Sequence, residues 1–72
     1  MTQKALEKIK GTVHKNALEY KKAQRKKLEE AGHENAAQSV KSSIAGYVQA
    51  MMDCGVITER DRELLFIYYG TI

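Results

Sequence analysis

Few residues in this chain have side chains that could act as metal ligands or as catalytic groups. Its two histidines, His14 and His33, stand 19 positions apart, and Cys54 is the single cysteine. Zinc and other transition-metal sites use closely spaced histidines or CxxC pairs, and the sequence contains neither pattern. We therefore expect no metal site and no cofactor. We place Cys54 on the apolar side of a helix, which predicts a buried structural thiol rather than a reactive one.

The motifs of the common enzyme classes do not occur either. The sequence has no glycine-rich phosphate loop, no serine nucleophile elbow and no paired carboxylates facing an apolar stretch. A chain of 72 residues forms one small domain with little concave volume for a substrate. We expect a protein that is not an enzyme, with no catalytic residue and no small-molecule substrate.

Lysines are the one abundant chemical group, and they gather in the first part of the chain. Residues 1–31 carry nine basic and four acidic side chains, net +5, whereas residues 32–72 are net −2. Five of the lysines would fall within about 40° on one continuous helix: Lys4, Lys8, Lys15, Lys22 and Lys26. Such a ridge, about 33 Å long, could neutralise nucleic-acid phosphates. The alternative is that an exposed helix face simply carries solvated charge.

Three helices would position these residues. An apolar stripe at helical spacing predicts a first helix over residues 2–31, in which Gly11 is the weak point. A second helix is expected over residues 35–54, capped by Asn35, and a third over residues 59–69. The stripe of the first helix contains these residues, with Gln24 in the same series: Leu6, Ile9, Val13, Ala17, Tyr20, Leu28 and Ala31.

Two glycine turns would fold these helices against one another. Gly32 and Gly55 suit the left-handed position that ends a helix. Thr58 and Asp61 have the spacing of a capping box, so the third helix starts directly after the second ends. The sequence predicts an all-α, three-helix domain spanning residues 1–72, with a long N-terminal helix and a helix-turn-helix-like antiparallel pair.

Uncharged surface on the second and third helices points to a partner. Between Ala36 and Met52 the only charged residue is Lys41, and the third helix is apolar on every side over residues 64–69. We take five residues as candidate contacts of a protein partner: Ala45, Gln49, Met52, Phe66 and Tyr69. The other three tyrosines are expected in the core. The alternative is an uncharged exterior without a partner.

Two stretches resemble known families. Residues 57–65, Ile-Thr-Glu-Arg-Asp-Arg-Glu-Leu-Leu, are similar to the opening helix of the helix-turn-helix in sigma-factor region 4 and LuxR-type regulators. The chain ends at Ile72, before a recognition helix, so this resemblance implies no DNA-reading role. Residues 31–37, 44–47, 53–60 and 65–69 resemble small uncharacterised helical proteins encoded on conjugative and other mobile elements of Gram-positive bacteria. That resemblance implies a bacterial cytoplasm and no particular activity.

The sequence favours a non-enzymatic helical protein-interaction module that self-associates as a homodimer or binds another protein. The alternative is a nucleic-acid-binding accessory protein of a mobile element, which uses the lysine ridge. The remnant of a truncated regulator is a third possibility. With no signal peptide, no membrane-spanning apolar run and one cysteine, we expect a cytoplasmic protein.

Overall fold

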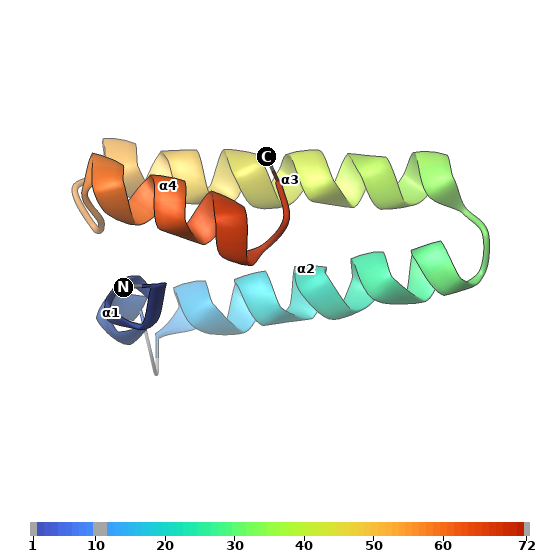
Figure 1. The fold of residues 1–72 in the computed structure, drawn as a ribbon, viewed down its shortest axis with the longest axis horizontal. Coiled ribbons are helices and arrows are strands. Elements are labelled where there is room, and N and C mark those ends of the chain that lie inside the picture. The colour runs from blue at the N-terminus through green and yellow to red at the C-terminus, as the bar shows by residue number, and fades with distance from the viewer. Residues whose placement is uncertain (1, 10–11, 72) are drawn as a thin grey trace.

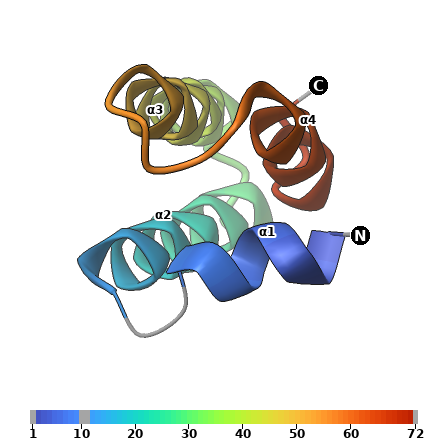
Figure 2. The same ribbon diagram turned by 90° about the vertical axis from the view of Figure 1, so that its left-hand side faces the viewer.

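The computed structural model describes residues 2–9 and 12–71, with side chains over residues 6–9 and 12–71. Four α-helices follow one another along these residues: α1 (Thr2–Ile9), α2 (Val13–Glu30), α3 (Glu34–Asp53) and α4 (Glu59–Tyr68). α2 and α3 form an antiparallel pair (Figure 1). α4 lies against one side of that pair, and α1 crosses beneath α4 (Figure 2). The predicted all-α fold is confirmed.

The residues predicted to form one long first helix form two helices. α1 ends at Ile9 and α2 begins at Val13. Thr12 caps the new helix, because its side chain accepts the N–H of Lys15 at 3.4 Å and its hydroxyl donates to the carbonyl of Ile9. A threonine that bonds nearby backbone in this way competes with a continuous helix. The predicted weak point, Gly11, lies outside the described residues.

Three helices end in the same way, with a glycine in the left-handed region. Gly32, Gly55 and Gly70 have φ values of 80°, 79° and 67°. The residue after each glycine donates its N–H to the carbonyl five residues back: His33 to Leu28, Val56 to Met51 and Thr71 to Phe66. These are Schellman motifs, which satisfy carbonyls that a helix end would leave unbonded. The predicted turns at Gly32 and Gly55 are confirmed.

The helix starts differ in how closely they follow the prediction. At α4 the predicted capping box is present: Asp61 N–H donates to Thr58 Oγ1 at 3.2 Å, and Thr58 N–H donates to Asp61 Oδ2 at 3.0 Å. At α3 the predicted cap at Asn35 is wrong. His33 is the N-cap and makes no side-chain capping bond. The turn after Gly32 leads the chain straight into the helix at Glu34, whose charge suits the positive end of the helix dipole.

The core lies where the four helices meet. Its buried members are Ile9, Leu18, Ile44, Val48, Met51, Ile57, Leu65 and Tyr69. The predicted apolar stripe is wrong within α2, since Val13 and Tyr20 are 73% and 72% exposed and Leu18 is fully buried. Because Thr12 restarts the helix, the stripe of α1 does not continue in phase through α2, and another face of α2 meets the core.

Three further burial predictions are wrong. Tyr69, predicted as a contact residue, is only 4% exposed, whereas Tyr68, predicted in the core, is 39% exposed. Cys54, predicted as a buried thiol, is exposed. Cys54 stands about 120° around the helix from Val48, so Met51 fills the core position in that last turn instead. Within residues 2–9 and 12–71, no helix has both the length and the apolar character that a membrane span requires.

Candidate protein-interaction surface

The predicted contact residues lie mainly where α3 and α4 face each other. Met52 and Phe66 are half-buried and pack against the core, and Ala45 is half-buried as well. Gln49 accepts a hydrogen bond at 2.9 Å from Arg62 of α4. Tyr69 belongs to the core itself. The chain therefore uses most of this predicted surface to join its own helices.

The predicted lysine ridge begins on α1, which does not run in line with α2. α1 crosses below α4 while α2 runs along α3 (Figure 2). The Lys8 ammonium forms an ion pair with the Asp61 carboxylate of α4. The side chain of Lys4 lies outside the described part of the chain. A single straight row from Lys4 to Lys26 therefore does not form, because the row assumed one continuous helix.

The three ridge lysines on α2 have different surroundings. Lys15 pairs with Glu19 at 3.2 Å. The Lys22 ammonium lies 4.9 Å from the centre of the Tyr68 ring, a cation–π contact. Lys26 is exposed. Contacts inside the chain thus occupy part of the charge that was predicted to meet phosphates, and nucleic-acid binding stays a prediction.

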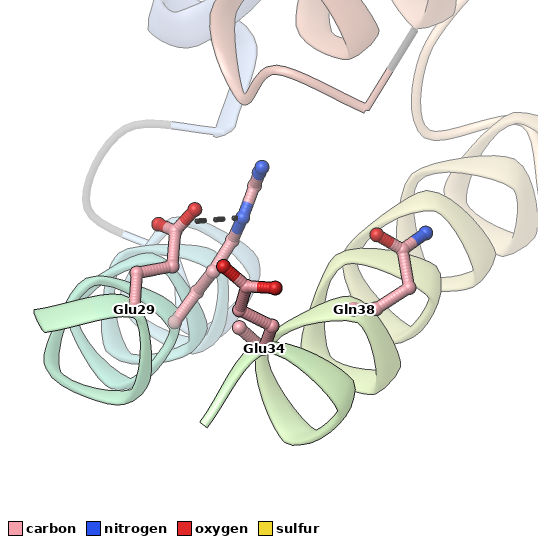
Figure 3. A pocket seen from close by; sticks show the side chains of 5 residues that line it. Glu29, Glu34 and Gln38 are labelled. Carbon is pink, nitrogen blue, oxygen red and sulfur yellow. Dashed lines mark ion pairs between the residues drawn. The ribbon is translucent and has the colours of Figure 1, made fainter. Parts of the chain in front are cut away.

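A polar pocket of about 300 Å³ opens between α2 and α3 beyond the end of α4 (Figure 3). Its lining is Arg25, Glu29, Glu34, Ala37 and Gln38. The Arg25 guanidinium lies 3.8 Å from the Glu29 carboxylate and donates to the carbonyls of Tyr69 and Gly70 at 3.0 and 3.3 Å. Arg25 thereby caps the C-terminal end of α4, where a cation is favourable. The pocket's central charge already has a structural role.

Burial and hydrogen bonding change the pKa values of two groups beside this cap. Burial raises the pKa of the Tyr69 hydroxyl, and so does the hydrogen bond of 3.0 Å that it donates to Glu19. Burial would also raise the pKa of Glu19, but hydrogen bonds from Tyr69 and Lys15 and the charges of Lys15 and Lys22 hold it below its ordinary value. Glu19 is therefore a carboxylate near neutral pH and holds the Tyr69 side chain in place.

The opposite side of the α2–α3 pair, away from α4, is open (Figure 2). We call it the outer face. Its residues are Val13, Ala17, Tyr20 and Gln24 of α2 and Ser39, Ser43, Gly46, Ala50 and Cys54 of α3. All except the half-buried Ala17 are exposed, and none carries a charge at neutral pH. An exposed aromatic residue on a surface without charged side chains is typical of a protein contact surface.

The outer face is hollowed in two places. One hollow of about 120 Å³ is lined by His14, Tyr47, Ala50, Met51, Cys54 and Val56. There the Nδ1 atom of His14 lies 2.9 Å from the Tyr47 hydroxyl, so the two polar atoms satisfy each other. The second hollow, of about 230 Å³, is lined by Tyr20, Ala23, Gln24 and Lys27. Both are of a size that one side chain of a partner could enter.

Charged side chains lie at the edge of the outer face, where the exposed Lys27 lines the second hollow beside Tyr20. The Lys21 ammonium donates to Ser43 Oγ at 2.8 Å across the two helices. Asp53 accepts a hydrogen bond from Gln49 at 3.1 Å, on the side toward α4. A partner that covers the outer face would therefore meet charge at the edge of the contact, where water can still reach it, and buried unpaired charges are the costly groups in an interface.

Gly46 has no role inside the chain that requires a glycine. It lies within α3, where glycine costs about 1 kcal/mol relative to alanine. A Cβ atom placed on Gly46 would meet nothing within 4 Å, and its φ is not positive. A small residue at this point would instead allow another helix to approach closely.

Sequence reasoning missed the outer face because it assigned the α2 half to the core. α2 has two apolar sides, one centred on Leu18 and one on Tyr20, and only the second continued the stripe of residues 2–9. The available signal was the pair Ala17–Leu18. Consecutive residues of a helix point about 100° apart, so this pair shows that apolar residues extend beyond a single stripe. Small residues at positions 39, 43, 46 and 50 of α3 were a second signal.

In the described part of the chain, histidine, cysteine and acidic residues do not gather in groups of three or more that could hold a metal ion. Comparison with known proteins adds no assignment to this geometry: no protein-family model, no curated protein and no solved structure matches the chain.

Proposed function

We propose that this chain is a non-enzymatic protein-interaction module that self-associates through the outer face. The observation that supports this most directly is the exposure of Val13 and Tyr20, at 73% and 72%, beside the small uncharged residues of α3. Tyrosine is among the residues that most often dominate binding energy at interfaces. The proposal keeps the predicted self-association and moves it from the side of α3 facing α4 to the opposite side.

A second copy is the occupant that we propose. The outer face is uncharged, so two copies with a net charge of +3 each can approach there without placing like charges in direct contact. α2 and α3 are about 27 and 30 Å long, and two helices side by side are about 20 Å wide. That area is at the low end for stable interfaces, so we expect a weak dimer with a dissociation constant on the order of tens of micromolar.

Analytical ultracentrifugation tests the proposal. We expect the protein to sediment as a monomer near 1 μM and mainly as a dimer near 300 μM, as the estimated affinity implies. Tyr20→Glu should leave a monomer at every concentration, since it places a charge on the outer face. It should remain folded because Tyr20 is exposed, and circular dichroism checks this.

Ile67→Glu is the matched control. Ile67 is 62% exposed on α4, away from the outer face, so this variant should dimerise like the unchanged protein. A monomer at 300 μM for the unchanged protein would overturn the proposal. Equal weakening by both variants would show that self-association does not depend on the outer face.

A further inference from the structure

We infer that two copies pack with a two-fold axis parallel to α2 and α3, so that α2 of each copy lies alongside α3 of the other. This arrangement rests on the proposed function and specifies its partner contacts. Two outer faces can meet around an axis parallel to the helices or around an axis perpendicular to them. The first places α2 on the partner's α3, and the second places α2 on the partner's α2.

Charge favours the first arrangement. α2 carries six basic and three acidic residues, net +3, whereas α3 carries one lysine and two acids, net −1. Placing α2 on the partner's α2 would bring two basic helices together, which is unfavourable at any ionic strength where charges still interact. Placing α2 on the partner's α3 brings opposite net charges together in both halves of the interface.

Side-chain size favours the same arrangement. The α2 half of the outer face presents the large Val13 and Tyr20, while the α3 half presents serine, glycine and alanine. Large residues facing small ones let two helices interdigitate at short distance. In the other arrangement, large residues would face large ones on α2, and small residues would face small ones on α3.

Symmetry then fixes which residues meet. Rotation about an axis parallel to the helices keeps every residue at its own height along that axis. Within one chain, Lys21 and Ser43 lie at the same height, because their side chains are hydrogen-bonded. Tyr20 therefore reaches the height of the partner's Ser43 and the partner's Gly46, where the missing Cβ leaves room for the ring. By the same relation, Gln24 comes to the height of the partner's Ser39.

The arrangement also gives each helix an antiparallel neighbour in the partner. α2 and α3 are antiparallel within the chain, and this axis leaves the direction of each helix unchanged. α2 therefore lies antiparallel to the partner's α3, and the four helices at the interface form an antiparallel bundle. That is a common and stable way for helices to pack.

Disulfide formation between copies tests this arrangement. In a Cys54→Ser background, protein with Gln24→Cys is mixed with protein carrying Ser39→Cys and oxidised gently at 300 μM. We expect a covalent dimer containing one chain of each kind. Both positions are exposed, so neither change should disturb the fold, and Tyr20 is retained.

Two control mixtures keep the result specific. Gln24→Cys mixed with Ala50→Cys should crosslink at least tenfold more slowly, because position 50 lies about 16 Å further along α3 than position 39. Gln24→Cys mixed with Ala17→Cys reports α2 against the partner's α2. If sedimentation shows a dimer but this last mixture crosslinks fastest, or none crosslinks, the arrangement is wrong and self-association stands. If sedimentation shows no dimer, the proposed function fails as well.

Discussion

Asp61 joins two helices through a single carboxylate. It accepts the N–H of Thr58 in the capping box of α4 and the ammonium of Lys8 from α1. Asp61 is 7% exposed and is the one charged residue that is buried in the described part of the chain. Burial would raise the pKa of Asp61, but the hydrogen bonds from Lys8 and Thr58 and the charge of Lys8 hold it below its ordinary value of 3.8. The folded state therefore favours the ionised form.

This pKa predicts how stability depends on pH. Because the folded-state pKa of Asp61 is below the unfolded value, its contribution is complete above about pH 4 and is lost as pH falls below that. Asp61→Asn should reduce the free energy of unfolding by about 2 kcal/mol at pH 7. The difference from the unchanged protein should shrink as the pH is lowered toward 2.5.

Urea unfolding at a series of pH values measures this difference. Glu63→Gln, at an exposed acid of the same helix, should cost less than about 0.5 kcal/mol at every pH. A difference between Asp61→Asn and the unchanged protein that stays constant down to pH 2.5 would contradict the assignment.

At the scale of the elements, three glycine turns and one tertiary cap determine where helices end. Gly55 has a left-handed φ of 79°, which residues with a Cβ atom rarely adopt. A Cβ atom placed there would meet no other atom within 4 Å. The end of α4 differs in that Arg25 of α2 donates to the carbonyls of the two residues that follow the helix, Tyr69 and Gly70. Through this cap, α2 holds the end of α4 in place beside the buried Tyr69, although α2 and α4 are far apart in sequence.

Two glycine-to-alanine changes should have opposite effects on monomer stability. Gly55→Ala should lower the free energy of unfolding by about 1 kcal/mol, because alanine is strained at positive φ. Gly46→Ala should raise it by about 0.5–1 kcal/mol, because position 46 is helical and open. Thermal unfolding at 1 μM, where we expect a monomer, measures both.

The Gly46 change also separates stability from assembly. If the partner approaches at Gly46, the more stable Gly46→Ala monomer should dimerise more weakly, as sedimentation at 300 μM would show. An unchanged dimer together with a more stable monomer would mean that no helix approaches Gly46 closely. A less stable monomer would contradict the open helical environment at this position.

At the scale of the whole molecule, the helices form two unequal layers. α4 and α1 cover one side of the α2–α3 pair, and the outer face on the other side is left open (Figure 2). The molecule measures 35 × 21 × 21 Å, so this pair runs along most of its length. A chain this small gains only a marginal core, and burial of the outer face in a dimer would add to its stability.

Stability should therefore rise with protein concentration. If folded chains dimerise with a dissociation constant of tens of micromolar, the thermal midpoint should increase by several degrees between 1 and 300 μM. Differential scanning calorimetry or circular dichroism in short-path cells would measure this. Tyr20→Glu should remove the dependence, and Ile67→Glu should retain it. A midpoint that is independent of concentration for the unchanged protein would contradict self-association.

The helical class and the turns can be predicted from the sequence alone. Gly32, Gly55 and the Thr58–Asp61 box act through local backbone geometry and hydrogen bonds within a few residues, so their outcome is readable from spacing alone. The same holds for α3 and α4, whose predicted limits differ from the observed ones by one residue at most. The break at Thr12 was not predicted, because the helix signal on both sides of it indicated one continuous helix over residues 2–31.

Which helix faces are buried depends on how the four helices pack together. α2 offers the core two apolar sides, and contacts with α3 and α4 selected Leu18 over Tyr20. Tyr69 became a core residue because Glu19 and Arg25, 50 and 44 positions away in the chain, satisfy its hydroxyl and its carbonyl. Burial depends on the contacts that all the helices make together, and these contacts cannot be read from the residue pattern of one helix.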